Sequence, residues 1–339
     1  MLSAYRCYDV MLNANSVSES PTMFSRRVFE ALACATPVVS LESVGMRAML
    51  GEHVRVARTR EETAAHLQAL LGDDEARVRE GHLAYRHVHE NHTYRHRVSR
   101  MMEEVGVGQV PSTASTVTVL GVVRNPDHLE SILADYVAQT YREKELLVVV
   151  AKEDFEVESV ESRVREVERA EMIRMGSLTF GERLNRAVEE ASGAYVAMFD
   201  DGDRYCERYI ADMMLAADFS GAAVLGKGSY FSYDEARDRV VLRNAGKDHT
   251  FVKSVAPSTI VVRREVLRDI PFEVEASGVD GTFPERATKR DLRIYSADRF
   301  NYLHVGIGTG RSRPPTSGNG PKDWLLGEGR SLALRRVSL

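Results

Sequence analysis

The chain has 339 residues, of which 43% are hydrophobic and 28% charged, and its formal net charge is -5. A single hydrophobic core stops growing well before this length, so two domains are expected. The composition is that of an ordinary globular protein. The negative net charge argues against a dedicated nucleic-acid-binding protein, which would need a concentrated basic face.

The three cysteines, Cys7, Cys34 and Cys206, have no paired spacing and are interpreted as free thiols of a reducing compartment. No apolar run reaches the ~18 residues that cross a bilayer. The N-terminus also lacks the charged and apolar segments of a signal peptide. We therefore expect a soluble, cytoplasmic protein whose only membrane contact would be peripheral, at the inner face of the membrane.

The first domain is predicted over residues 1–105. Its apolar patterns predict a strand at Cys7–Asn13, a helix at Ser25–Cys34, a strand at Pro37–Leu41, and helices at 61–71 and 74–104. This alternation is typical of half a doubly wound α/β unit. Residues 106–116 are rich in Gly, Pro, Ser and Thr and predict an interdomain linker.

The second domain is predicted over residues 117–305. Largely apolar runs predict buried parallel strands at Val117–Val123, Leu146–Val150, Glu171–Met175 and Ala194–Phe199. Thr179 and Glu182 have the spacing of a capping box and predict a helix that continues to Ala191.

Residues 306–339 are rich in Gly, Pro and Ser, which predicts a flexible, solvated tail. The alternative is that Trp324, Leu325, Leu326 and the nearby basic residues contact a membrane surface or a partner.

Five of the ten histidines fall within residues 82–96. His92 and His96 share one helix face at a spacing of four residues, so a zinc site there is conceivable. No cysteine or carboxylate arrangement reinforces it, and a polar, exposed helix is the preferred interpretation.

An acidic turn follows the strand predicted at Ala194–Phe199. Asp200, Asp201 and Asp203 come directly after this strand, where open parallel sheets bind their ligands. Three carboxylates within four residues repel one another unless a cation or hydrogen-bond donors compensate. Hard oxygen ligands suit Mg²⁺ or Mn²⁺, and we expect Gly202 to permit the tight backbone of the turn. The competing interpretation is a solvated turn that caps the following helix.

The segments 181–185 (GERLN) and 193–203 (GAYVAMFDDGD) resemble family 2 glycosyltransferases of the GT-A fold, as does Val117–Leu120 through Arg124-Asn125-Pro126. The resemblance implies an α/β fold with a GT-A-type nucleotide-sugar-binding domain and a mainly parallel central sheet. Many members have four consecutive aspartates at the turn, where this chain has Gly202 in the third place.

The resemblance also implies functional roles for individual residues. Asp201 and Asp203 would bind Mn²⁺ or Mg²⁺, with His304 as a third ligand or a diphosphate contact. The residues expected to contact the nucleotide-diphosphate sugar are Asp154, Arg183, Asn185 and Asp200. The competing interpretations are a surface carboxylate for Asp154, a polar helix face for Arg183 and Asn185, and a structural histidine for His304.

A general base must deprotonate the acceptor hydroxyl. Residues 278–283 (GVDGTF) are similar to the acceptor motif of the same family, in which an aspartate is the base. Asp280 is therefore the candidate base, although Val279 replaces the common Glu and Pro284 is unusual. A turn-forming Asp before Gly is the competing interpretation.

Residues 20–40 resemble the donor-binding lobe of GT-B glycosyltransferases, especially the spore-maturation-type enzymes. Glu30 would correspond to the glutamate that binds the ribose. The acceptor lobe of such enzymes is absent, so the first domain is interpreted as a partial Rossmann-like lobe that is structural or at most binds a nucleotide.

These features together predict a metal-dependent inverting glycosyltransferase. It would move a sugar from a nucleotide-diphosphate sugar to a cell-surface polysaccharide or another glycoconjugate, with a glycan or glycolipid as the acceptor. The alternative is a catalytically silent nucleotide- or glycan-binding module. A nucleotidyltransferase is disfavoured because Val117–Pro126 lacks a Gly-rich, basic phosphate loop.

Overall fold

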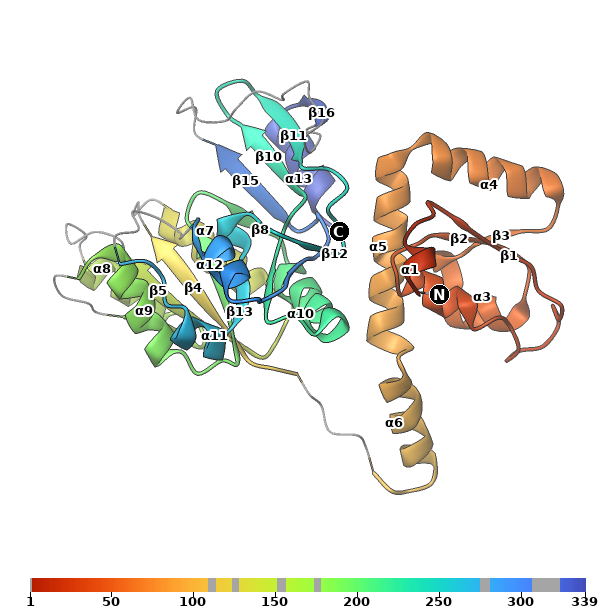
Figure 1. Ribbon diagram of the computed structural model, residues 1–339, viewed down its shortest axis with the longest axis horizontal. Helices are drawn as coiled ribbons and strands as arrows, with labels where there is room; N and C mark the ends of the chain where they lie inside the picture. The colour runs from red at the N-terminus through yellow and green to blue at the C-terminus, as the bar shows by residue number, and fades with distance from the viewer. Residues whose placement is uncertain are drawn as a thin grey trace. The chain divides into compact units, whose positions relative to one another are not determined.

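The chain divides into two compact units, Met1–Ser112 and Thr113–Leu339 (Figure 1). The computed structural model describes residues 2–108, 114–123, 128–150, 157–173, 178–274, 281–306 and 324–339. Each unit is described by itself.

The first unit is built on a small parallel sheet. Its strands are β1 (Met11–Asn13), β2 (Val38–Leu41) and β3 (Arg55–Ala57), in that order. Its helices are α1 (Leu2–Tyr5), α2 (Arg27–Leu32), α3 (Val44–Leu50), α4 (Arg60–Gly72), α5 (Asp74–Asn91) and α6 (Tyr94–Glu104), with a 3₁₀ turn η1 (Gly51–His53). Apolar side chains of α2, β2, α3 and α5 form its core.

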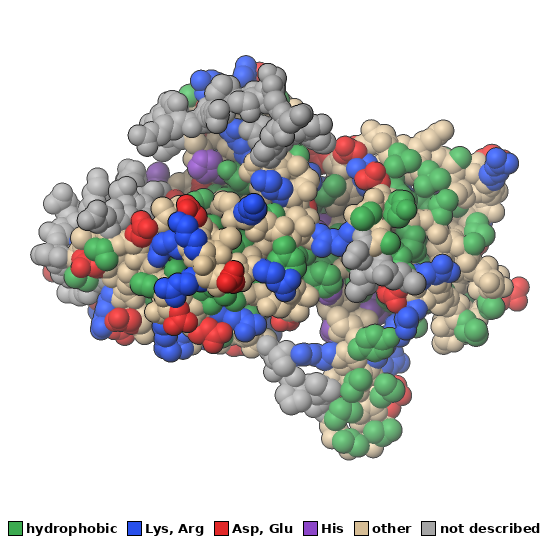
Figure 2. Space-filling model, in the orientation of Figure 1, with side chains coloured by type: hydrophobic (Ala, Val, Ile, Leu, Met, Phe, Trp, Pro, Cys, Tyr) green, Lys and Arg blue, Asp and Glu red, His purple; other side chains and the backbone are tan. Residues whose placement is uncertain are grey.

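The helix predicted over residues 74–104 is two helices, because the chain breaks at His92 and Thr93. Thr93 has an extended backbone and caps α6 in a capping box with His96. On α6, Tyr94, Val98, Met101 and Val105 are exposed, and hydrophobic side chains gather over this helix in Figure 2.

The second unit is built on an eight-stranded sheet. Its order is β12-β14-β9-β13-β7-β4-β5-β6. The bounds are β4 (Val117–Val123), β5 (Lys144–Val150), β6 (Ala170–Met172), β7 (Tyr195–Asp200), β9 (Val224–Gly226), β12 (Thr250–Val252), β13 (Val261–Arg263) and β14 (Ile294–Ser296). Strands β6, β5, β4 and β7 are mutually parallel, whereas β13 is antiparallel to both β7 and β9.

Helices cover both faces of this sheet. Because successive side chains of a strand point to opposite faces, Val119 and Phe199 join one core, and Leu120 and Met198 join the other. The first core includes α7 (Leu129–Ala138), α8 (Val157–Arg165) and α10 (Tyr209–Ser220). The second includes α9 (Phe180–Glu190), α11 (Arg264–Asp269) and α12 (Phe283–Lys289).

A second, five-stranded sheet was not predicted. Its order is β16 (Trp324–Glu328), β11 (Arg239–Arg243), β10 (Tyr230–Asp234), β15 (Tyr302–Gly306) and β8 (Arg204–Tyr205), and all neighbours except β10 and β15 are antiparallel. Helix α13 (Arg330–Val337) packs on it and buries Ala333 and Val337. Residues 324–339, expected within a flexible tail, therefore form part of this layer.

The predicted fold class is corrected by this topology. Six of the eight strands of the large sheet run in one direction, but the prediction lacked the antiparallel strands β12 and β13 and the mostly antiparallel sheet beside them. Local apolar runs do not encode strand direction, which is why the mixed pairing was missed. Within the described residues, none of the helices is both long and apolar enough to span a membrane.

Gly181 and Gly202 provide a matched test of the packing in the second unit. A Cβ at Gly181 would overlap the backbone carbonyl of Glu273, whereas a Cβ at Gly202 would meet open space. Overpacking costs about 1–3 kcal/mol when backbone must move. We expect Gly181→Ala to lower the free energy of unfolding in urea by that amount and Gly202→Ala to leave it nearly unchanged. Equal effects of the two substitutions would contradict the packing around α9.

Candidate functional site

The acidic turn lies at the carboxyl end of β7, beside three other parallel strands. Asp200 is the last residue of β7, and the backbone N–H of Asp203 donates to its carbonyl oxygen at 3.1 Å. All three aspartates of the turn are buried, with 9% of Asp200, 5% of Asp201 and 4% of Asp203 exposed. Buried carboxylates require donors or cations, so their partners decide what the turn can do.

Asp203 is held by three donors from β15. Its Oδ2 accepts from the hydroxyl of Tyr302 at 2.6 Å, and its Oδ1 contacts His304 Nδ1 at 2.8 Å and the N–H of Val305 at 3.1 Å. Strand β8 follows Asp203 directly and pairs with β15. Because side chains alternate along a strand, Tyr302 and His304 lie on the same face. The pairing of β8 with β15 thus brings both to Asp203.

Asp200 is held by hydrogen bonds with Ser258 and Tyr205. Its Oδ2 accepts from the hydroxyl of Ser258 at 3.1 Å, and its N–H donates to the hydroxyl of Tyr205 at 2.9 Å. Tyr205 donates in turn to the carbonyl of Ser258 at 2.8 Å and stacks on Phe199 with ring centroids 3.9 Å apart. Ser258 lies in the 3₁₀ turn η3 (Pro257–Thr259). This packing gives the turn a rigid base.

The turn is open at Gly202. Among the described residues, no heavy atom outside its neighbours lies within 4 Å of the place where a Cβ would stand, and its φ is not in the left-handed region. The turn thus accommodates glycine but would also accept an L-residue at this position. Beside the turn, His128 Nδ1 lies 3.8 Å from Asp201 Oδ2.

The charges of the turn shift the pKa values of its neighbours. Burial lowers the pKa of His304, but the hydrogen bond to Asp203 and the charges of Asp203 and Asp200 outweigh burial and raise it above the usual value. Burial and the charge of Asp203 raise the pKa of Tyr302 well above its usual value. The Tyr302 hydroxyl therefore stays protonated and donates to Asp203.

The contacts of Asp203 bear on the expected cation site. Asp203 was expected as a direct ligand, yet both its oxygens accept hydrogen bonds. A carboxylate that accepts from one nitrogen of an imidazole fixes the ring and leaves the other nitrogen to coordinate a metal. Asp203 therefore orients the imidazole of His304 through Nδ1.

Two residues expected to contact the donor are used within the fold. The Asn185 side-chain amide donates to the carbonyl of Phe272 at 2.9 Å and accepts from its N–H at 2.8 Å. Arg183 donates to the carbonyls of Val150 at 2.8 Å and Leu178 at 2.9 Å. The Asn185 amide thus clamps the backbone of Phe272. Arg183 secures the carboxyl end of β5.

Asp154 and Asp280 lie outside the described residues. The first described residue after Asp280 is Gly281, whose Cβ position would stand 3.7 Å from Pro257 Cγ. Pro257 adjoins Ser258, which contacts Asp200. The chain therefore re-enters the described structure next to the base of the acidic turn.

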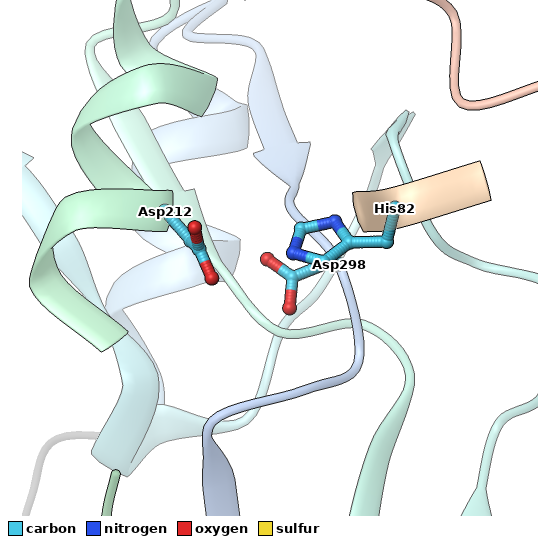
Figure 3. Close-up of side chains that lie close together, drawn as sticks. All are labelled: His82, Asp212 and Asp298. Atoms are coloured by element: carbon cyan, nitrogen blue, oxygen red, sulfur yellow. The ribbon is translucent and has the colours of Figure 1, made fainter. Parts of the chain in front are cut away.

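A buried ion pair holds the loop that precedes β15. The sequence analysis did not predict it. Lys227 Nζ lies 2.9 Å from both carboxylate oxygens of Asp298, and both side chains are almost fully buried. Nearby, the Asn301 amide donates to Asp212 at 2.8 Å. Figure 3 shows Asp212 on α10 and Asp298 in its loop; His82, drawn with them, belongs to the first unit.

No local sequence pattern predicts this ion pair. Lys227 and Asp298 are 71 positions apart and meet because β9 and β14 are parallel neighbours whose carboxyl ends coincide. A buried lysine requires such a partner. The pair and the Asn301 contact hold the loop that delivers Tyr302 and His304 to the acidic turn.

The first unit has a cavity of about 510 Å³ beside β1. It is lined by residues that include Tyr5, Asn13, Arg27 and Thr36. Glu30, expected to bind a ribose, accepts from the hydroxyl of Tyr5 at 3.1 Å and pairs with Arg26 at 2.8 Å.

A comparison with protein-family models matches residues 1–103 to the family described as "Glycosyl transferase-like". This part of the chain is thus similar to that family, and glycosyltransferase is the class of enzyme that the match indicates. No curated protein matches the chain.

Several solved structures are similar over part of the chain. TarS 1–349 of S. aureus is 18% identical, with 56% of this chain and 60% of that chain covered and a TM-score of 0.43. The same protein in complex with UDP-GlcNAc is 17% identical, with 56% of this chain and 58% of that chain covered and a TM-score of 0.44. The mannosyltransferase PcManGT from Pyrobaculum calidifontis, in complex with GDP-Man and Mn²⁺, is 14% identical. The similarity covers 60% of this chain and 59% of that chain, with a TM-score of 0.44. The chain thus spans about 60% of the length of each of these proteins. Similarity at this level does not establish its activity or its ligands, which depend on its own residues.

The family assignment made from the sequence is corrected by the family match. Family 2 and the GT-A fold were assigned to residues 117–305, with only a remnant before them, whereas the match lies at residues 1–103. An acidic turn after a buried strand is a local feature that recurs on α/β folds of different families, so it does not identify one.

Tyr302 and Asp203 can be tested as a coupled pair. Hydrogen bonds to charged groups contribute about 1.5–3 kcal/mol, so Tyr302→Phe should lower the free energy of unfolding by that amount at neutral pH. In a double-mutant cycle with Asp203→Asn, urea denaturation should give a coupling energy above about 1 kcal/mol. Strictly additive effects would contradict the hydrogen bond as the link between the turn and β15.

Proposed function

We propose that the acidic turn at residues 200–203 is the metal and diphosphate site of a glycosyltransferase. The enzyme moves a sugar from a nucleotide-diphosphate sugar to a cell-surface polysaccharide or glycoconjugate acceptor. The observation that carries the proposal is the cluster of three buried aspartates at the carboxyl end of β7, under open space at Gly202. The family match at residues 1–103 supports the reaction class.

We assign a separate role to each side chain of this site. Asp201 and His304 would hold a Mn²⁺ or Mg²⁺ ion, while Asp203, itself hydrogen-bonded by Tyr302, orients His304. When bound, the ion neutralises the charge that develops on the leaving diphosphate. Asp200, held by Ser258, keeps the turn in place and adds negative charge that favours cation binding.

Asp280 is proposed as the general base of a direct displacement, which inverts the configuration of the transferred sugar. It accepts the proton of the acceptor hydroxyl as the oxygen forms its bond to the anomeric carbon and the diphosphate leaves. The support is that Gly281 stands next to Pro257, close to the residues that hold Asp200. Asp154, which follows β5 closely in sequence, is retained as a proposed contact to the nucleotide.

A silent nucleotide- or glycan-binding module remains the second candidate, because Asp203 already satisfies both carboxylate oxygens within the protein. Hydrolysis of nucleotide-diphosphate sugars separates the two candidates. A transferase releases nucleoside diphosphate slowly in the presence of Mn²⁺ and not with EDTA, and Asp201→Asn abolishes this release. Donor binding without metal-dependent release would favour the silent module.

Asp280→Asn removes the proton acceptor and preserves the side-chain shape. We expect turnover to fall by about 10² or more while donor affinity stays close to that of the wild type. Asp269→Asn, at the exposed end of α11, is the matched control and should retain full turnover. Full activity of Asp280→Asn would remove this residue from the mechanism.

A further inference from the structure

Three ligand-type atoms converge in the first unit. His87 Nε2 and His92 Nε2 lie 3.2 Å apart, and they lie 3.1 and 3.0 Å, respectively, from the backbone carbonyl oxygen of Met49. The three atoms form a nearly equilateral triangle.

The local structure explains why these atoms meet. His87 lies in the last turns of α5, and His92 is the residue at which this helix ends. Met49 lies in the last turn of α3, where carbonyl groups lack intrahelical partners and carry the negative end of the helix dipole. His53 stacks on His87 with ring centroids 4.2 Å apart and restrains that imidazole.

Hydrogen bonds account for only part of this triangle. A neutral imidazole nitrogen either donates one proton or accepts one, and a carbonyl oxygen accepts through two lone pairs. If both nitrogens donate to Met49, the contact of 3.2 Å between His87 and His92 has no hydrogen bond. If one nitrogen accepts from the other, its lone pair faces the carbonyl oxygen. At least one of the three contacts is therefore not a hydrogen bond.

A cation accounts for all three contacts at once, since each of the three atoms can then offer a lone pair. Zinc lies ~2.1 Å from nitrogen and oxygen ligands, so neighbouring ligand atoms around a tetrahedral ion are ~3.4 Å apart. The edges of the triangle, 3.0 to 3.2 Å, approach this spacing. His87 and His92 are half-buried and Met49 is exposed, which leaves the fourth position to water.

We propose that His87 Nε2, His92 Nε2 and the Met49 carbonyl oxygen bind one divalent transition-metal ion, with water as the fourth ligand. Imidazole ligands and a small tetrahedral site select zinc-type ions over Mg²⁺ and Ca²⁺. The ion links the end of α3 to the junction of α5 and α6. The site is independent of the function proposed for the acidic turn.

The proposed pair differs from the one that spacing suggests. In sequence, His92 pairs with His96 across one helical turn. In the structure, His96 Nδ1 instead accepts from the backbone N–H of Thr93 at 3.3 Å and contacts its hydroxyl at 2.7 Å, which caps α6. His96 is therefore a matched control that separates the two pairings.

The test is a titration of the full chain, without an affinity tag, with Co²⁺ followed by visible absorption. Tetrahedral cobalt with imidazole ligands absorbs strongly, whereas cobalt held by carboxylates and water absorbs weakly, so the acidic turn does not interfere. The wild type and His96→Gln should give the strong bands at one equivalent, and Zn²⁺ should displace the cobalt. His87→Gln and His92→Gln should each weaken binding at least tenfold.

Thermal unfolding in EDTA shows whether each variant folds, and added Zn²⁺ should raise the unfolding temperature of the wild type but not of His87→Gln. The proposal is overturned if the wild type shows no strong bands, or if His87→Gln and His92→Gln keep them. Loss of the bands in His96→Gln alone would also overturn it, since the sequence pairing would then be correct.

Discussion

The second unit depends on one buried carboxylate. Asp203 accepts hydrogen bonds from Tyr302, His304 and Val305, and so joins the acidic turn of the large sheet to β15 of the smaller one. A carboxylate with only 4% of its residue exposed is tolerable because each contact offers a proton. The same contacts place an imidazole beside the turn, so the groups that stabilise the fold also build the proposed cation site.

The surrounding structure maintains that junction. The loop before β15 is held by the buried pair of Lys227 and Asp298, and the N–H of Asn301 donates to the carbonyl of Val337 at the end of α13. Asn301 has a φ of 61°, a left-handed conformation that asparagine tolerates better than most residues. Residues at the end of the chain thereby contribute to the geometry of a site whose sequence motif lies more than a hundred positions earlier.

The sequence predicts those parts of the fold that depend on neighbouring residues. The apolar run at Val117–Val123 is strand β4, and the capping box of Thr179 and Glu182 begins α9 as predicted. The position of the acidic turn after a buried strand follows from the same local reasoning. The contacts that bury Asp203 and Asp200 are not encoded there, because they come from β15 and from Ser258.

The errors share a physical cause, since each depends on residues that meet only in the folded chain. Contacts between residues far apart in sequence determine three such features. They are the direction of β13, the layer formed by residues 324–337, and the hydrogen bonds between Asn185 and the backbone of Phe272. The family prediction rested on short motifs in residues 117–203, whereas the family match lies at residues 1–103. The pairing of His87 with His92 was missed because helix α5 ends between them.

The central claim is that the acidic turn binds a diphosphate through a cation. Its most direct test is calorimetric titration of the full chain with UDP and GDP, in Mn²⁺ and in EDTA. The account predicts that Mn²⁺ raises the affinity for at least one nucleotide tenfold or more, which corresponds to about 1.4 kcal/mol. It also predicts that Asp201→Asn abolishes this gain. An affinity that is the same with and without Mn²⁺, or a gain that survives Asp201→Asn, would contradict it.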